Sequence, residues 1–292
     1  MQKLVSAPTE LRPAHPPSPP ETLWIYSYQG RFSPSATRAL VNFLGTWIEE
    51  DLSFLFFTQP AENQVRDLEK ACPWVQRLDN YRMSYVDWIG GELTPFSVGR
   101  IHIRPLWASG SAPSGMEKID LDPGVVFGGG THQTTLDCLK GLNLLAENGV
   151  TGRLVDIGCG TGILALAAAR LGWGQILAFD LNPLAAWTSK ANVERNDLAE
   201  QVLVIQGRAE DALPIPAQTL VANIHYDIMA KIVEHKSFGS AQNVILSGLL
   251  RSQAMEIRDQ LRRLGFCIDQ ILDDGTWFTL LGHRQSCSEN RK

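Results

Sequence analysis

One segment, residues 153–180, limits the possible folds of this chain more than any other. It opens with the apolar run RLVDI, which is typical of a buried parallel strand, and continues with the turn GCGTG. The run ILALAAARL then predicts a buried helix that ends at Gly172, and a second apolar run ends in Asp180. This order of strand, glycine turn, helix, strand and acid predicts a doubly wound α/β fold with a ligand at the carboxyl ends of its parallel strands.

The glycine turn and the acid together indicate a nucleoside ligand. Glycine adopts positive φ and lets a ligand approach the backbone without a Cβ in the way, which makes Gly158 and Gly160 candidates for ligand contact. The carboxylate of Asp180 can accept hydrogen bonds from the two hydroxyls of a ribose, each contributing about 1.5–3 kcal/mol. Asp156 at the end of the first strand and Leu181 after the acid complete this set of candidates.

Two classes of nucleoside ligand compete for such a turn. A dinucleotide favours the spacing GxGxxG, because its pyrophosphate binds at the N-terminus of the helix, whereas this chain has DxGxGxG. S-adenosylmethionine carries a sulfonium cation and no phosphate, so it tolerates nearby carboxylates and needs no Lys or Arg. None lies between Asp156 and Ala169. S-adenosylmethionine is therefore the favoured cofactor, while a dinucleotide and a purely structural turn remain as alternatives.

The sequence after Asp180 predicts the rest of a seven-strand methyltransferase sheet. Apolar runs predict three further strands, an amphipathic helix and a closing hairpin at residues 202–206, 220–224, 244–247, 252–264 and 266–283. An antiparallel last strand distinguishes this plan from that of a dinucleotide dehydrogenase. Asn223 falls at the carboxyl end of one strand. Glu210 follows another strand and is either a partner for the adenine amino group or a solvated loop acid.

The N-terminal part of the chain divides into three regions. Residues 1–20 contain six prolines and predict an extended, mobile arm. Residues 21–88 predict a small α/β domain of the ferredoxin-like type, with a helix at 35–50, and are expected to serve recruitment or packing rather than chemistry. Residues 89–118 predict a linker, and residues 119–292 the large domain.

Composition excludes several classes of partner. The net charge of −5 and the lack of a basic patch with interleaved aromatics argue against a nucleic acid or membrane partner. The five cysteines form no CxxC pair and no metal-ligand spacing, which predicts reduced thiols and no metal.

Residues 1–20 lack the apolar core of a signal peptide, and no apolar run reaches the roughly 18 residues of a membrane span. We therefore expect a cytoplasmic protein, with a monomer favoured.

A longer signature lies just before the glycine turn. Residues 121–135 read LDPGVVFGGGTHQTT, which resembles the pattern LDPGxAFGTGxHxTT of the ribosomal protein L11 methyltransferases, the PrmA type. Residues 156–164 and 221–224 also match that family, and the resemblance covers roughly residues 119–249. The first signature is specific to the family, whereas the glycine turn is shared by all class I methyltransferases.

The resemblance implies a class I methyltransferase fold with a small N-terminal domain for substrate recognition. It implies S-adenosylmethionine as the methyl donor and N-methylation of lysine side chains and a terminal α-amine on a ribosomal protein. Donor-binding residues carried over by the resemblance are Thr131, Gly158, Asp180 and Asn223, with Phe127 and Gly128 lining the pocket. The chain departs from the family at Gly129, at Gln133 and at the pair His225–Tyr226, which would lie beside the acceptor pocket.

Three residues are candidates for catalysis. The side-chain oxygen of Asn223 can orient an amine, and His132 and His225 are possible proton acceptors. Each histidine also has a structural interpretation, His132 as a residue that fixes the glycine-rich loop and His225 as an exposed residue at a helix start. The run 128–130 is a candidate flexible lid. Two other functions stay open: a methyltransferase with a different protein or metabolite acceptor, and a non-catalytic protein that binds the donor.

Overall fold

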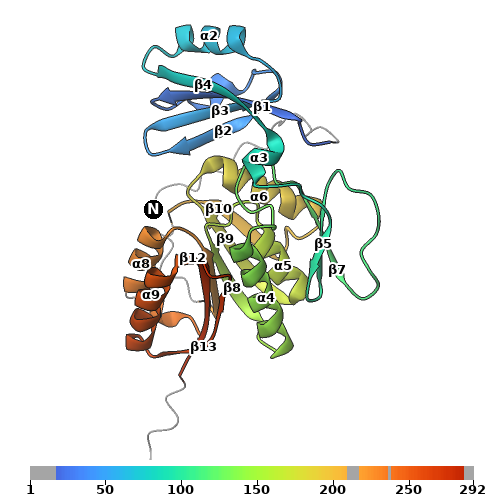
Figure 1. The fold of residues 1–292 in the computed structure, drawn as a ribbon, viewed down its shortest axis with the longest axis vertical. Helices are drawn as coiled ribbons and strands as arrows, with labels where there is room; N and C mark the ends of the chain where they lie inside the picture. Colours follow the sequence, from blue (N-terminus) through green and yellow to red (C-terminus); the bar gives the residue numbers. More distant parts are fainter. Residues whose placement is uncertain (1–17, 209–216, 236–237, 286–292) are drawn as a thin grey trace, which may run out of the picture.

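A computed structural model describes residues 18–208, 217–235 and 238–285, and its largest feature is the predicted seven-strand sheet (Figure 1). The sheet and its helices are formed by α4 (Gln133–Glu147), β8 (Gly152–Ile157), α5 (Ile163–Leu171), β9 (Trp173–Asp180), α6 (Pro183–Arg195), β10 (Val202–Gln206), β11 (Thr219–Asn223), α8 (Tyr226–Glu234), η1 (Phe238–Ser240), β12 (Asn243–Leu250), α9 (Arg251–Arg263), β13 (Phe266–Asp273) and β14 (Trp277–Arg284). The strand order is β10-β9-β8-β11-β12-β14-β13. The first five strands pair in parallel, and β14 runs antiparallel to both its neighbours, which confirms the predicted fold class.

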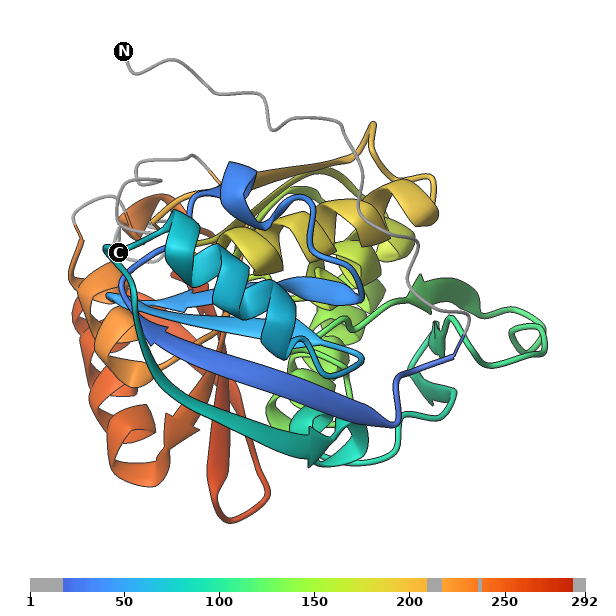
Figure 2. The same ribbon diagram turned by 90° about the horizontal axis from the view of Figure 1, so that it is seen from above.

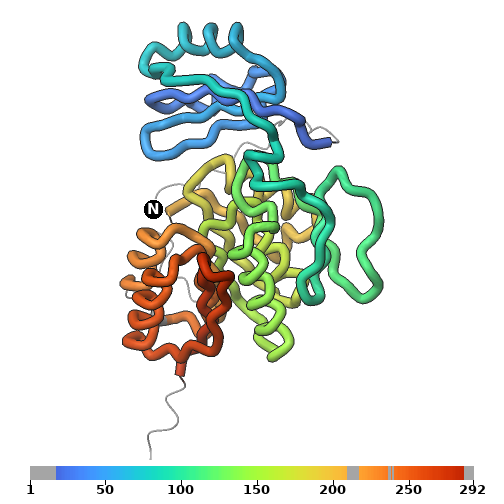
Figure 3. Tube along the Cα trace, in the orientation of Figure 1, coloured from blue at the N-terminus to red at the C-terminus, as the bar shows by residue number. Residues whose placement is uncertain are grey.

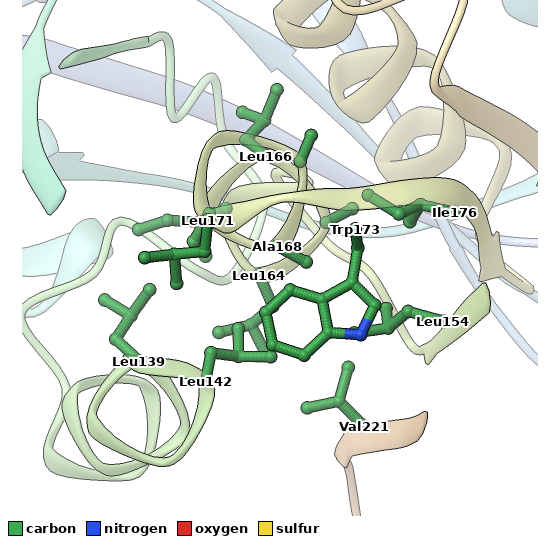
Figure 4. Packing of buried hydrophobic residues seen from close by; sticks show 14 of the residues in the cluster. Leu139, Leu142, Leu154, Leu164, Leu166, Ala168, Leu171, Trp173, Ile176 and Val221 are labelled. Carbon is green, nitrogen blue, oxygen red and sulfur yellow. The ribbon is translucent and has the colours of Figure 1, made fainter. Parts of the chain in front are cut away.

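Alternation along the strands divides the core between the two faces of this sheet. Leu154 packs on one face with α4 and α5, while its neighbour Val155 packs on the other with α8 and α9. Figure 4 shows Trp173 between Leu142 of α4 and Leu164 of α5 on one side and Leu154 and Val221 of the sheet on the other. Its indole N–H donates to Thr219 Oγ1 at 3.3 Å, so this large side chain is fully buried without an unpaired donor. The predicted end of α5 at Gly172 is confirmed by the left-handed conformation of that residue.

The first described elements form a separate four-strand sheet. They are β1 (Thr22–Gln29), α1 (Pro34–Thr37), β2 (Phe43–Glu49), β3 (Leu52–Phe57), α2 (Glu62–Ala71), β4 (Gln76–Ser84) and α3 (Tyr85–Ile89). The antiparallel order β2-β3-β1-β4 is that of a ferredoxin-like domain, and α2 lies on the side away from the large sheet (Figures 1 and 2).

The helix predicted at residues 35–50 is wrong. Only the part within α1 is helical, and Phe43–Glu49 in the second half of the range form β2. Glu49 pairs with Leu52, so Glu50 and Asp51 form a two-residue turn in which Glu50 has φ 49°. The spacing of large apolar residues in this range fits a helix as well as a strand, and hairpin pairing with β3 decided the outcome.

A third sheet lies within and just after the range that the sequence suggests as a linker. It contains β5 (Phe96–Val98), β6 (Ile101–Pro105) and β7 (Glu117–Leu121). Ile101, Ile103, Ile119 and Leu121 are completely buried in the same cluster as α4 and α5. Much of this connection therefore packs into the same hydrophobic core as the large sheet and its helices.

The small sheet rests on the large domain above the start of α6, as the ribbon and the tube show (Figures 1 and 3). An apolar cluster joins the two parts: Leu23, Ile25 and Phe56 come from the small sheet, and Val125, Val126 and Leu184 from the large domain. Hydrogen bonds support the contact, because Asn182 Nδ2 donates to the carbonyl of Ile48 at 2.9 Å and Trp88 Nε1 to that of Val125 at 3.0 Å. Among the described residues, no helix has the length and apolar character to cross a membrane.

Candidate active site

The glycine turn between β8 and α5 is closely packed on two sides. Gly158 and Gly160 have φ of 74° and 54°, in the left-handed region. A Cβ on Gly158 would strike the side chain of Ile224, and one on Gly160 would strike the carbonyl oxygen of Phe127. Glycine is therefore required at both positions, for conformation and for space.

The loop before α4 covers this turn with backbone carbonyl groups. Thr161 donates from its backbone N–H to the carbonyl of Phe127 at 3.2 Å and from its hydroxyl to the carbonyl of Gly128 at 2.6 Å. In dinucleotide-binding proteins, the pyrophosphate binds at this helix N-terminus. Two carbonyl oxygens beside it disfavour an anion, and this geometry argues against the dinucleotide alternative.

Asp180 is held in place at the end of β9. Its Oδ2 accepts from the backbone N–H of Gly160 at 2.9 Å, and its Oδ1 accepts from that of Asn182 at 2.8 Å. Burial raises the pKa of Asp180, while these two amides lower it. Each oxygen keeps a second lone pair, so the carboxylate can still accept hydrogen bonds from ligand hydroxyls.

Asp156 lies beneath the turn instead of facing the ligand space. It is 1% exposed, and neither of its carboxylate oxygens has a hydrogen-bond partner among the described residues. Burial raises its pKa to about 7, while the nearby amide of Ala165 lowers the pKa and the charge of Asp180 raises it further. Asp156 belongs to the support of the turn, and the structure does not place it in the cavity.

A cavity of about 810 Å³ lies at the carboxyl ends of β8, β9 and β11. We name it the donor cavity after the residues that the sequence predicts to bind the donor and that line it. Predicted residues that line it are Phe127, Gly158, Gly160, Asp180, Leu181, Asn223 and His225. The small sheet adds Trp47 and Ile48 of β2, together with Arg31 and Glu50. Sequence reasoning missed these four residues, because no motif links them to the glycine turn and the helix expected at 35–50 obscured the β2–β3 hairpin.

The amide of Asn223 is oriented by two threonines. Its Nδ2 donates to Thr134 Oγ1 at 3.0 Å and to Thr135 Oγ1 at 3.4 Å. His132 Nδ1 lies 2.8 Å from Thr134 Oγ1 and also accepts from the Thr134 backbone N–H at 3.4 Å, as the N-cap of α4. In the consistent assignment, the Thr134 hydroxyl donates to His132 and accepts from Asn223, so the Asn223 carbonyl oxygen is left for a ligand.

A second cavity of about 630 Å³ adjoins the donor cavity and shares Trp47 and Phe127 with it. Gly128, Thr131 and His132 line this second cavity. Sequence reasoning placed Thr131 and Gly128 with the donor. In the structure both line the second cavity, and the carbonyl of Gly128 accepts from Thr161 of the glycine turn, so their contact with the donor stays a prediction. The other aromatic residues here, Trp88 and Trp277, carried no sequence signal.

The glycine run 128–130 is packed in this structure. Thr161 holds its first carbonyl, and a Cβ on the buried Gly130 would lie 2.5 Å from Phe96 Cζ. Gly129 alone of the three has open space around it, with its nearest neighbour, Leu93 Cδ2, at 4.0 Å. Gly128 and Gly130 are therefore packed in this structure, and the lid suggested by the sequence stays a prediction.

The pair His225–Tyr226 starts α8. His225 is the N-cap residue, its side chain is 76% exposed, and its Nδ1 lies 3.3 Å from Asp227 Oδ2. Tyr226 lines neither cavity, and a hydrogen bond to Glu256 raises its pKa. Only His225 therefore reaches the donor cavity. Glu210 and residues 1–17 of the proline-rich arm lie outside the described residues.

Comparison with known proteins agrees with the resemblance seen in the sequence. The sequence model of the family "Ribosomal protein L11 methyltransferase (PrmA)" matches residues 59–285. The ribosomal protein L11 methyltransferase of Pelotomaculum thermopropionicum is 36% identical to this chain over 62% of its length. That of Anoxybacillus flavithermus is 35% identical over 64% of this chain. The matched regions span 59% and 60% of those two relatives, which is less than two thirds of their length.

A solved structure supports the same relationship. The crystal structure of a ribosomal protein L11 methylase from Lactobacillus delbrueckii subsp. bulgaricus covers 66% of this chain and 100% of its own, with a TM-score of 0.59 and 26% identity. The family match extends over most of the chain, from α2 to the last described strand, and includes the glycine turn, Asp180 and Asn223. The chain therefore belongs to the ribosomal protein L11 methyltransferase (PrmA) family.

Proposed function

We propose that this protein transfers methyl groups from S-adenosylmethionine to amino groups of a ribosomal protein, with ribosomal protein L11 as the acceptor that its family membership indicates. The observation that carries the proposal is the glycine turn, which has backbone carbonyl oxygens on one side and the carboxylate of Asp180 on the other. That environment suits a cationic, phosphate-free nucleoside. The four free cysteines among the described residues fit a reducing cytoplasm, where ribosomes are found.

The residues of the donor cavity fit this cofactor. Asp180 would accept the ribose hydroxyls beside the turn, which Gly158 and Gly160 allow to pack closely against Ile224 and Phe127. A volume of about 810 Å³ lies within the usual range of cofactor pockets. When bound, S-adenosylmethionine supplies an electrophilic methyl group on a positively charged sulfur.

The protein's own contribution to the reaction is mainly alignment. An amine attacks as a neutral group, and the Asn223 carbonyl oxygen can hold its N–H bonds so that the nitrogen lone pair faces the methyl carbon. Alignment of this kind can lower the activation free energy by roughly 7–11 kcal/mol. Because the Nδ1 atom of His132 is engaged with Thr134, we assign His132 to the support of Asn223 instead of proton transfer.

Two measurements test the proposed function. Calorimetry should show binding of S-adenosylhomocysteine and none of NAD. Incubation with radiolabelled S-adenosylmethionine and ribosomal proteins that lack these methyl groups should label one protein of the mass of L11, as intact-mass analysis would verify. Binding of NAD would overturn the cofactor assignment. Donor binding without transfer to any ribosomal protein would overturn the proposed reaction.

A further inference from the structure

We propose that the second cavity is the acceptor site, that it receives the acceptor as a positively charged amine, and that Trp277 and Asp274 of the β13–β14 hairpin select it. This inference rests on the proposed function and adds the residues that recognise the substrate. We call this space the acceptor cavity from here on.

The acceptor cavity is placed to deliver a ligand to the donor cavity. Trp47 and Phe127 line both spaces, so the two adjoin along these side chains. His132 lines the acceptor cavity, and its contact with Thr134 continues to Asn223, which lines the donor cavity. An ammonium group bound in this cavity must lose one proton before it reacts, and solvent water at the exposed hairpin takes that proton. The neutral amine then passes His132 and approaches the amide that we assign to orienting it.

Aromatic rings form much of the wall. Trp47, Trp88, Phe127, His132 and Trp277 all line the cavity. The Phe127 and His132 rings lie 5.6 Å apart at 64°, and those of His132 and Trp277 lie 5.6 Å apart at 66°, so three rings form a continuous surface. Aromatic surfaces of this kind attract an ammonium group through the negative faces of the rings.

The charge of the cavity has one sign. Its described lining includes no Lys or Arg, whereas Arg31 and Arg208 both line the donor cavity. Asp274 is the acidic residue of the lining, and it is exposed at the tip of the hairpin. An ammonium group would find both a carboxylate and aromatic faces here, while a carboxylate or phosphate group would be repelled.

The hairpin turn fixes this carboxylate in its charged form. Asp274 Oδ1 accepts from the backbone N–H groups of Thr276 at 2.9 Å and Trp277 at 2.7 Å. These hydrogen bonds hold the pKa of Asp274 below its usual range. Asp274 is therefore a poor proton acceptor and a suitable electrostatic anchor. The same turn sets the position of Trp277, so charge and ring act as one unit.

A pair of variants on the same turn tests the anchor. Asp274→Asn keeps an oxygen for both backbone N–H groups and removes the charge. Asp273→Asn is the matched control, because Asp273 Oδ1 caps Gly275 at 3.1 Å but does not line the cavity. With ribosomal protein L11 as acceptor, we expect Asp274→Asn to raise KM about two- to fivefold at low salt, with kcat unchanged, and the difference to shrink at high salt. Asp273→Asn should match the unaltered protein.

A second measurement needs no turnover. In the protein saturated with S-adenosylhomocysteine, the indole N–H signal of Trp277, assigned with Trp277→Leu, should shift on titration with n-butylammonium and not with n-butanol. Asp274→Asn should raise the Kd for n-butylammonium about two- to fivefold. Trp277→Phe, which keeps an aromatic face, should raise the KM for the acceptor less than Trp277→Leu does.

The outcomes separate the two proposals. Failure of the unaltered protein to bind S-adenosylhomocysteine or to label any amine would refute the proposed function itself. Normal labelling with identical KM values for Asp274→Asn and Asp273→Asn, and equal responses to n-butylammonium and n-butanol, would refute the acceptor site alone.

Discussion

At the scale of single residues, the buried carboxyl of Asp156 gives the protein a distinct dependence on pH. Its pKa in the folded protein is about 7, against 3.8 for an exposed aspartate, because burial disfavours the charged form. The folded state therefore holds this proton more tightly than the unfolded chain. The stability that this group contributes is fully present below its unfolded pKa and is lost as the pH rises through about 7.

Asp156→Asn should remove this dependence. Between about pH 4 and pH 8, the free energy of unfolding of the unaltered protein should fall relative to that of the variant, by up to about 4 kcal/mol. Urea unfolding at a series of pH values, without added cofactor, gives the difference directly. Stability curves that stay parallel over this range would show that Asp156 is ionised in the folded protein.

Thr134 provides a second residue-scale prediction, because its hydroxyl joins His132 to Asn223. Thr134→Val keeps the shape of this buried side chain but leaves the Asn223 amide without its nearer acceptor. We expect kcat to fall about ten- to hundredfold with unchanged affinity for S-adenosylhomocysteine, and Thr134→Ser to restore most of the rate. Thr135→Val is the control, since the Thr135 contact is longer, at 3.4 Å. Equal losses in the two valine variants would contradict the relay.

At the scale of elements, the turn between β8 and α5 depends on the space that its glycines leave. Gly160→Ala would add a Cβ against the carbonyl oxygen of Phe127 at a residue with φ 54°. Gly149→Ala is a matched control, because Gly149 has φ 76° and nothing within 4 Å of its Cβ position. Both variants should lose about 1 kcal/mol of stability from the strained backbone, and Gly160→Ala should lose more, because the carbonyl of Phe127 must move to make room for the Cβ. Only Gly160→Ala should also lose affinity for S-adenosylhomocysteine, as calorimetry would measure, and equal affinities would contradict the packing described here.

The elements also show which parts of the structure can be predicted from the sequence. The strands around the glycine turn were predictable because continuous apolar runs flanked by glycine have few alternatives. Asp180 was identified as a candidate by its position at a strand end, whereas the role of Asn223, which also ends a strand, came from the family resemblance. The secondary structure of residues 35–50 was not predictable, because the spacing of their large apolar residues fits a helix as well as the hairpin that formed. Trp47 and Trp277 could not be assigned to a cavity, since only the packing of distant elements brings them beside Phe127 and His132.

At the scale of the whole molecule, the donor cavity is complete only while the small sheet stays docked. Leu184 of α6 is 5% exposed in the apolar cluster that joins the two parts, and Leu203 of β10 is 61% exposed. Leu184→Ala should destabilise the interface by about 2–4 kcal/mol and weaken binding of S-adenosylhomocysteine, because Trp47 and Ile48 would lose their fixed position. Leu203→Ala should leave both properties unchanged. Limited proteolysis between the domains and calorimetry measure the two effects, and intact donor affinity in Leu184→Ala would show that the small sheet is dispensable for the donor.

The place of β14 in the large sheet has a consequence for how the chain is made. This strand is the last of the described elements in sequence, yet it pairs with β12 on one side and β13 on the other. Until residues 277–284 emerge during synthesis, the hydrogen-bonding edge of β12 that they will occupy has no partner within its own sheet. A nascent chain stalled before Trp277 would expose that apolar edge as a template for aggregation, so the final hairpin both completes the fold and protects it.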